Sequence, residues 1–288
     1  MPGTLYLVAT PIGNLDDMPP RVAATFAAAD FVAAEDTRVT LRLLNHLGLK
    51  KPLVSYYEHA LHHGEAILAR IEAGEDCALC SDAGMPCISD PGAVLVKDAL
   101  DRGIRVVPVP GASACVTALA VSGQDTSRFV FEGFLPQPKK ERRARLDVLR
   151  REPRTILLYE APHKLRATLD DLVQTLGPDR SVTLCRELTK LHEEIVKTTL
   201  GAAAEHYRAN DPRGEYVLVV AGAGPETAGE EAPLTRADVT AAARQLLEQG
   251  LSLSAAAKQA AAGTPFARGE IYKALLAERE AAPDEAGE

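Results

Sequence analysis

Short apolar runs alternate with longer amphipathic stretches through the first 110 residues. A short apolar run between turn residues predicts a buried strand, and apolar positions three and four apart predict a helix. On this pattern we expect strands near 4–9, 30–34, 52–55, 76–81 and 104–109, and helices near 20–28, 38–47, 62–73 and 91–102. Gly48, Gly74 and Gly103 stand where helix C-terminal glycines occur. The pattern therefore predicts an α/β domain over 1–110 with a largely parallel sheet.

A second α/β domain is expected over residues 111–222, after the Pro108, Pro110 and Gly111 hinge. Its predicted strands lie near 128–132, 154–159, 181–186, 193–199 and 215–221. We expect the last two to pair antiparallel, which would make this sheet mixed.

The C-terminal region predicts a linker and a small helical appendage. Residues 223–233 are rich in Gly, Ala, Pro and Glu, as in a flexible linker. The appendage at 234–280 should hold helices near 235–249, 253–262 and 267–279. The last two straddle Gly263-Thr264-Pro265 in the manner of a helix-turn-helix, and both RNA contact and a capping or dimer role remain open. The acidic tail from Glu280 should fray.

Composition indicates an ordinary globular protein. The chain has 288 residues, 46% of them hydrophobic and 25% charged, and a net charge of −8. No apolar stretch approaches the roughly 20 residues that span a bilayer. The N-terminus has no signal-peptide pattern, so we expect no membrane partner and a cytoplasmic location.

The cysteines and histidines do not predict a metal site. Cys77 and Cys80 lie three apart in an expected strand and so face opposite sides, which favours packed thiols over a metal or redox pair. His59, His62 and His63 occupy a polar segment, read as a solvated helix start with RNA contact as the alternative. No metal is expected.

One stretch of the chain is strongly basic. Residues 139–154 hold eight Lys or Arg against three acids, a local balance of +5. Such a run is usually a solvated helical face. Because it adjoins the Glu132–Pro136 segment beside a candidate site, we favour RNA phosphate contact by Lys139, Lys140, Arg142 and Arg143.

The segment 79–92 carries the clearest ligand signal. An apolar run ends in Ser81-Asp82-Ala83-Gly84, and the chain restarts with Asp90 as expected N-cap and Pro91 as expected first helical residue. Small residues at the carboxyl end of a strand let a ligand approach the backbone closely. An ordinary strand–helix loop is the alternative.

Further motifs occur in a fixed order around this loop. They are Thr10-Pro11-Ile12-Gly13-Asn14-Leu15, Ala34-Glu35-Asp36-Thr37-Arg38, Val107-Pro108-Val109-Pro110-Gly111, Phe131-Glu132-Gly133-Phe134-Leu135-Pro136, Tyr159-Glu160-Ala161-Pro162-His163-Lys164 and Arg186-Glu187-Leu188-Thr189-Lys190. With the loop at 79–92 they closely resemble the ribosomal RNA small subunit methyltransferase I family of the tetrapyrrole methylase superfamily. The resemblance is dense over 4–222 and looser over 234–279. Pro11-Ile12-Gly13-Asn14-Leu15-Asp16 stands where tetrapyrrole methylases show Gly-x-Gly-x-Gly-Asp, which weakens a tetrapyrrole assignment.

The resemblance implies two α/β domains with S-adenosyl-L-methionine (AdoMet) in the cleft between them, and a homodimer. It also implies methylation of the ribose 2′-hydroxyl of a cytidine in the decoding region of 16S rRNA, in the small ribosomal subunit. The positions matching the family's cofactor segments are Pro11, Ser81, Asp82, Ala83, Gly84, Ile88, Ala114, Cys115, Thr117, Tyr159, Glu160 and Ala161. Asp82 is the expected polar anchor, with a loop-capping aspartate as the alternative.

Charged residues at predicted strand ends are the candidates for catalysis. Glu187 would orient or accept the proton of the hydroxyl, Arg186 and Lys190 would hold phosphates, and Glu35, Asp36 and Arg38 would close the opposite wall. Each acid could instead be half of a buried ion pair. A small-molecule methyltransferase and a non-catalytic ribosome-assembly factor are the rival functions.

Overall fold

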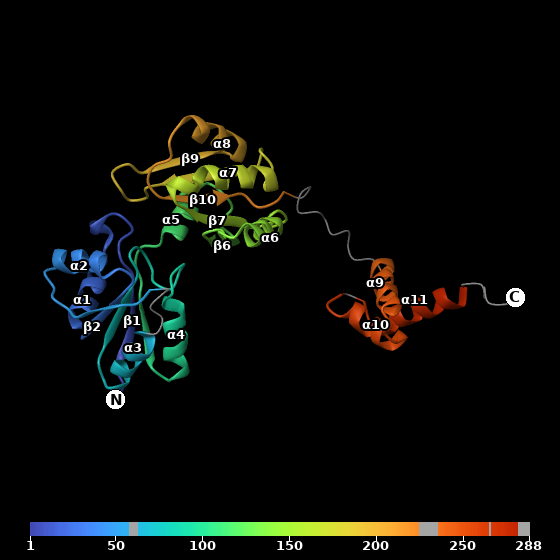
Figure 1. Cartoon of the computed structure of the whole chain (residues 1–288), viewed down its shortest axis with the longest axis horizontal. Helices are drawn as coiled ribbons and strands as arrows, with labels where there is room; N and C mark the ends of the chain where they lie inside the picture. Colours follow the sequence, from blue (N-terminus) through green and yellow to red (C-terminus); the bar gives the residue numbers. More distant parts are fainter. Residues whose placement is uncertain (58–62, 225–235, 265, 282–288) are drawn as a thin grey trace. The chain divides into compact units, whose positions relative to one another are not determined.

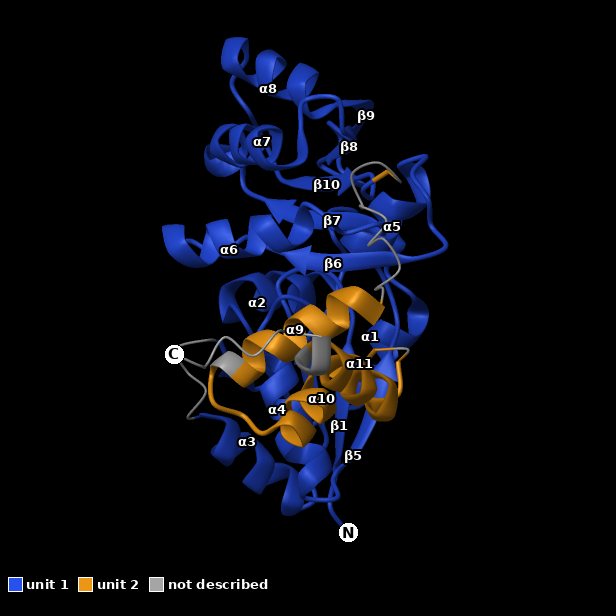
Figure 2. Ribbon diagram, turned by 90° about the vertical axis from the view of Figure 1, so that its right-hand side faces the viewer, with its two compact units in different colours: residues 1–223 blue, residues 224–288 orange. Residues whose placement is uncertain are grey.

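The computed structural model describes residues 1–57, 63–224, 236–264 and 266–281. The chain divides into two compact units, residues 1–223 and residues 224–288 (Figure 2). His59 and His62, the expected linker from 225 onward, Pro265 and the tail beyond 281 lie outside the described residues.

Five parallel strands form the first sheet of the larger unit, in the order β3-β2-β4-β1-β5 (Figure 1). The strands are β1 (Thr4–Val8), β2 (Phe31–Ala34), β3 (Leu53–Ser55), β4 (Cys77–Cys80) and β5 (Arg105–Val109). The helices that connect them are α1 (Pro20–Ala28), α2 (Thr37–His46), α3 (His63–Glu72) and α4 (Gly92–Asp101), with a short 3-10 turn, η1 (Leu15–Asp17), before α1. The predicted parallel sheet with its connecting helices is confirmed.

The two cysteines of β4 pack into different cores. Cys77 lies in the cluster around Ile67 and Leu68, and Cys80 lies in the cluster around Phe26 and Leu44. Burial raises the pKa of Cys80 to about 12. Since alternate side chains of a strand face opposite sides of the sheet, the prediction of packed thiols is confirmed.

The start of α4 differs from the prediction by one residue. Pro91 is the N-cap and Gly92 the first helical residue, whereas Asp90 was expected at the cap. The Asp90 carboxylate still accepts the N–H groups of Ile88 and Gly92, so it fixes the end of the loop.

The second sheet is mixed, with the order β6-β7-β10-β8-β9. Its strands are β6 (Phe129–Gly133), β7 (Thr155–Glu160), β8 (Ser181–Arg186), β9 (Glu194–Thr199) and β10 (Tyr216–Val220). Only β6 and β7 pair in parallel. The mixed sheet was predicted correctly, but the pairing of 193–199 with 215–221 was wrong, because β8 separates them. The all-buried β10 suits the centre, and the exposed residues of β9 suit an edge.

Four helices accompany the second sheet: α5 (Ala114–Val121), α6 (Lys139–Leu149), α7 (Pro162–Leu176) and α8 (Leu200–Ala209). One core joins Leu146 and Leu149 of α6 to apolar residues of α7 and the sheet. Another core contains Ile12, from the loop after β1, together with Leu157 and Val217. The first loop of the chain is therefore anchored on the second sheet.

The smaller unit has a core of its own. Its helices are α9 (Arg236–Glu248), α10 (Leu253–Ala261) and α11 (Arg268–Ala281). Val239, Ala257 and Ile271 pack together, one from each helix. No helix in the described part of either unit is long and apolar enough to cross a membrane.

Candidate functional site

A cavity of about 350 Å³ lies where loops from the two sheets meet. The residues that line it follow strands β2, β4, β7 and β8 at their carboxyl ends, where open α/β sheets bind ligands. The volume is in the range of small-molecule sites. The principal lining segments are Glu35, Ser81–Met85, Ile88–Asp90, Ser113–Ala114, Tyr159–Ala161 and Glu187–Leu188.

The cavity wall is strongly acidic. Six carboxylates face one ammonium, that of Lys190; they are Glu35, Asp82, Asp90, Glu160, Glu187 and Glu215. A wall of this sign attracts a cationic ligand.

Glu35 and Asp82 are linked through the backbone. The Asp82 N–H donates to Glu35 Oε2 over 3.3 Å, and the Asp36 N–H donates to Asp82 Oδ1 over 2.9 Å. Burial raises the pKa of Glu35, and the carboxylates of Asp82 and Asp90 raise it further against the Asp82 hydrogen bond. Burial also raises the pKa of Asp82. Partial burial disfavours the charged form of both groups, although Asp82 is the more exposed residue, and a cation or a hydrogen-bond donor would stabilise the two carboxylates.

Glu187 lies in a different environment on the opposite wall. Its Oε1 accepts both Lys190 Nζ and the Glu215 N–H over 2.9 Å. Burial raises the pKa of Glu187, but the bonds from Lys190 and Glu215 outweigh it, so the pKa is lowered overall. Burial lowers the pKa of Lys190, but its two carboxylate partners raise it overall. Glu187 is therefore a carboxylate and Lys190 an ammonium at neutral pH.

Strained backbone is concentrated at this cavity. Among the described residues, positive φ angles outside glycine occur at Cys87 (72°), Ser89 (66°), Glu187 (50°) and Thr189 (67°). All four lie in the two loops that line opposite walls. Such strain persists where the surrounding structure enforces it, and it is common at functional sites.

Close backbone approaches hold these loops in place. A Cβ on Gly13 would lie 2.4 Å from Lys190 Cγ, and a Cβ on Gly133 would lie 2.6 Å from Ser89 Oγ. Each glycine lets a loop of one sheet touch a loop of the other. The cavity walls are thus fixed by contacts between the two halves of the larger unit.

Glu160 is the most buried acid of the wall, at 4% exposure. Its carboxylate accepts the Ala161 N–H over 2.9 Å and the Thr168 hydroxyl over 2.5 Å. The neighbouring Tyr159 hydroxyl accepts the Cys115 N–H over 3.1 Å, which ties the start of α5 to β7. Burial raises the pKa of Tyr159, so its hydroxyl stays protonated.

Comparison with known proteins identifies the family. Residues 4–204 match the model described as Tetrapyrrole (Corrin/Porphyrin) Methylases. Ribosomal RNA small subunit methyltransferase I of Synechocystis sp. is 46% identical over 275 residues, covering 95% of this chain and 98% of its own. The protein of that name from Halalkalibacterium halodurans is 49% identical over 230 residues, 80% of this chain and 79% of its own. The chain belongs to the ribosomal RNA small subunit methyltransferase I family.

Solved structures agree on the fold. Uroporphyrin-III C-methyltransferase from Thermus thermophilus, determined with S-adenosylhomocysteine, has a TM-score of 0.55 at 18% identity and covers 76% of this chain and 97% of its own. At this identity the likeness concerns the fold alone. The expected fold class, with two α/β halves and C-terminal helices, is confirmed.

Most of the residues that match family cofactor segments line the cavity. These are Ser81, Asp82, Ala83, Gly84, Ile88, Ala114, Tyr159, Glu160 and Ala161. Pro11 instead lines a neighbouring cavity of about 240 Å³ that shares Ser81 and Asp82. Cys115 is a core residue that reaches the site through Tyr159, and Thr117 lies in α5 without lining the cavity.

The catalytic candidates separate into two groups. Glu35, Glu187 and Lys190 line the cavity. Asp36 instead caps α2 and pairs with Arg38 over 2.6 Å, and Arg186 pairs with Glu194 over 3.2 Å. Hydrogen bonds from Arg38 lower the pKa of Asp36 to about 2. The side chains of Asp36, Arg38 and Arg186 therefore serve local structure.

Several further residues line the cavity without a site role predicted from the sequence, among them Asp90, Phe134 and Glu215. The sequence predicts Asp90 as a helix cap and Glu215 as the start of a strand, and it places Phe134 within a motif. Phe134 lay in a quoted motif, so an exposed aromatic there was a usable signal. No local pattern distinguishes Glu215.

In the described residues, no group of three or more His, Cys, Asp or Glu side chains could hold a metal ion.

Proposed function

We propose that the chain transfers a methyl group from AdoMet to the ribose 2′-hydroxyl of a cytidine in the decoding region of 16S rRNA. The observation that carries the proposal is the acidic cavity at the strand ends, in a chain whose family is that of rRNA small subunit methyltransferase I. We further propose that it acts on the small ribosomal subunit, in the cytoplasm, as a homodimer. Light scattering that finds a monomer at micromolar concentration would contradict the homodimer.

The cavity fits AdoMet in size and charge. AdoMet is the cofactor of the family, and when bound it supplies a methyl group on a positively charged sulfur. The carboxylates of Glu35, Asp82 and Glu160 suit the positive charges of this ligand. Gly84 has a φ of +84°, and a Cβ there would lie 3.2 Å from Ile12. Glycine therefore lets the Ser81–Gly84 loop keep this conformation in the cavity wall.

AdoMet held by Glu35, Asp82 and Glu160 would supply the methyl carbon, which would pass from sulfur to O2′. The 2′-hydroxyl must lose its proton as the methyl group is transferred. Glu187 Oε1 is occupied by Lys190 and Glu215, while Oε2 has no hydrogen-bond partner among the described residues. We propose that Oε2 accepts the hydroxyl hydrogen bond and takes the proton late in the transfer, while the fixed loops hold the oxygen in line.

The test is methyl transfer from tritium-labelled AdoMet to isolated small subunits that lack the modification. We expect label in 16S rRNA, recovered as 2′-O-methylcytidine after digestion to nucleosides. Label on a base, or on a tetrapyrrole offered in parallel, would overturn the proposed substrate. Binding of subunits without transfer would indicate the assembly factor instead.

A further inference from the structure

A second, larger hollow lies between helices α6 and α7. It has a volume of about 790 Å³ and is lined by five cations and two carboxylates. The cations are Lys139, Arg142, Arg143, Arg150 and Lys164; the carboxylates are Asp147 and Asp171. This groove has the opposite sign to the cavity and to the chain as a whole, which carries −8.

One of the five cations is committed to the protein itself. Arg142 Nε donates to Asp171 over 2.7 Å, and Arg142 Nη2 donates to Thr168 over 2.9 Å. Arg142 and Asp171 thus neutralise each other in the wall between the two helices. Four cations then face a single carboxylate, that of Asp147.

The remaining four cations are not paired. Lys139, Arg143, Arg150 and Lys164 have no ion-pair partner in the part of the chain that the structure describes. Among the other described arginines of this half, Arg145 pairs with Glu132, Arg154 with Glu152 and Arg208 with Asp170, whereas Arg128, Arg151 and Arg213 have no ion pair and lie outside the groove. Like charges collected in one groove repel each other, so an anion that spans the groove would relieve the repulsion.

Two short segments of the chain contribute residues to both the groove and the methyl-transfer cavity. Leu135 and Gln137 line the groove, while Phe134, directly before them, lines the cavity. Ala161 lines the cavity, and Lys164 lines the groove less than one helical turn later. The linings of the groove and the cavity are thus joined by residues 134–137 and 161–164.

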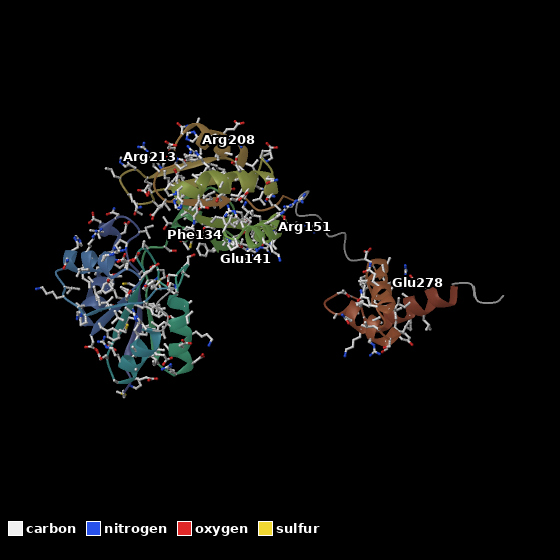
Figure 3. All side chains as sticks on the ribbon, viewed as in Figure 1. Phe134, Glu141, Arg151, Arg208, Arg213 and Glu278 are labelled. Carbon is white, nitrogen blue, oxygen red and sulfur yellow. The ribbon has the colours of Figure 1, made fainter. Side chains whose placement is uncertain are left out.

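An exposed aromatic ring lies at this junction. Phe134 (labelled in Figure 3) is 56% exposed, and its ring forms a T-shaped pair with Tyr159, with centroids 5.8 Å apart. More than half of this residue's surface is therefore open to contact by another ring. Unpaired RNA bases stack on exposed aromatic rings, and the stacking tolerates any base.

We propose that the groove between α6 and α7 binds the phosphodiester backbone of single-stranded rRNA next to the target nucleotide, with one base stacked on Phe134. The proposal rests on the proposed function, because it uses the cavity as the end point of the RNA. The contacts would come from Lys139, Arg143, Arg150 and Lys164. Arg142 belongs to the wall and would not bind phosphate.

The first test measures the salt dependence of binding to a short single-stranded RNA and to isolated small subunits. The test variant is the full chain with Arg143→Ala, Arg150→Ala and Lys164→Ala. The matched control removes three exposed cations that line no cavity: Arg21→Ala, Lys50→Ala and Arg105→Ala. Loss of three phosphate contacts should lower the slope of log K against log salt by about 2 for single-stranded RNA.

We expect the control to keep the wild-type slope and both variants to keep the wild-type affinity for AdoMet. An unchanged slope in the groove variant, or an equal loss in the control, would overturn the proposal. Inorganic phosphate at constant ionic strength should not displace the RNA. If inorganic phosphate weakens RNA binding as much as the triple substitution does, the groove is a site for free phosphate and the proposal fails.

The second test is Phe134→Leu, which keeps an apolar neighbour for Tyr159 and removes the ring. RNA affinity should fall about tenfold in a variant whose thermal unfolding matches that of wild type. Unchanged RNA affinity would overturn the stacking contact. If wild-type protein methylates subunits while the groove variants bind RNA normally, the inference alone fails; if wild type transfers no methyl group, the proposed function fails.

Discussion

Carboxylates of one chemical type have different properties in this protein because of their neighbours. Asp36 accepts hydrogen bonds from Arg38 at the start of α2, which lowers its pKa to about 2. Glu35, the preceding residue, is turned into the cavity, where burial raises its pKa. A single peptide bond thus separates a structural acid from a candidate functional one.

Glu35→Gln should make the protein more stable at neutral pH. Since burial raises the pKa of Glu35 in the folded state, its ionised form is less favourable there than in the unfolded chain. The stability cost is absent below the unfolded pKa and present above the folded one. We expect the variant to have a higher Tm than wild type at pH 7, with the difference vanishing near pH 4, and a weaker affinity for AdoMet.

The control for this comparison is Glu205→Gln, at an exposed position of α8. It should leave both Tm and AdoMet affinity unchanged. A lower Tm for Glu35→Gln at neutral pH would show that the charged form is stabilised in the fold, against this account.

Glu187→Gln should lower kcat about 10²-fold and leave AdoMet affinity within about twofold, because the hydroxyl contact matters in the transition state. Single-turnover methyl transfer to small subunits measures it. Near-normal kcat for Glu187→Gln, with folded but inactive Glu35→Gln or Asp36→Asn, would assign the role to the first sheet. If none of the three lowers kcat, positioning alone carries the reaction.

Sequence motifs located the site better than they located its individual contacts. The segments at 81–84 and 159–161 could be selected from order and residue type alone. Asp36 caps α2 and pairs with Arg38 two residues away, and Lys190 pairs with Glu187 three residues away, so both contacts are local. The contact of Lys190 with Glu215 joins residues 25 apart in sequence, and no local pattern contains it.

At the scale of elements, a line of hydrogen bonds runs from α6 through α7 to β7. Arg142 donates to Thr168, and Thr168, having one hydroxyl proton, donates it to Glu160. Arg142 is held in turn by Asp171. Two helices outside the cavity therefore fix a carboxylate of its wall.

Thr168→Val should leave Glu160 with an unpaired oxygen in a buried place, at a cost of about 1–3 kcal/mol of stability. We expect AdoMet affinity to fall about tenfold, with a comparable fall for Arg142→Ala and little further loss in the double variant. Calorimetric titration provides the affinities. Arg151→Ala, exposed just after α6 (Figure 3), is the control and should bind normally.

Normal AdoMet affinity in a folded Thr168→Val variant would show that the hydrogen bonds from Arg142 through Thr168 do not position Glu160 for AdoMet binding. Asp171→Asn supplies a milder variant if Thr168→Val does not fold.

Element order was predictable where each element is closed by local signals. The hydrophobic periodicity, together with the Gly and Pro residues between elements, predicts the strands of the first sheet and the helices that end at glycines. The neighbour of β9 in the sheet could not be predicted, because by composition β8 and β10 are equally suitable partners for an edge strand. Burial of all five residues of β10 decides the order, and burial is a property of the assembled sheet.

At the scale of the molecule, charge is separated rather than spread. Six carboxylates line the cavity, and four cations that have no ion-pair partner among the described residues line the groove. The net charge of −8 therefore does not represent the charge of either surface. An acidic chain can therefore still present one basic surface to an anionic partner. The helices of residues 236–281 form a separate core, and RNA contact and a capping or dimer role both stay open for them.

The most direct test of the account is calorimetric titration of AdoMet into the full chain with a metal chelator present. We expect one binding site per chain, unaffected by the chelator, and a loss of at least about tenfold in affinity for Asp82→Ala, which removes a carboxylate from the cavity wall. Undiminished binding by a folded Asp82→Ala, or loss of binding when the chelator is added, would contradict the assignment of this cavity as the site of a metal-independent methyl donor.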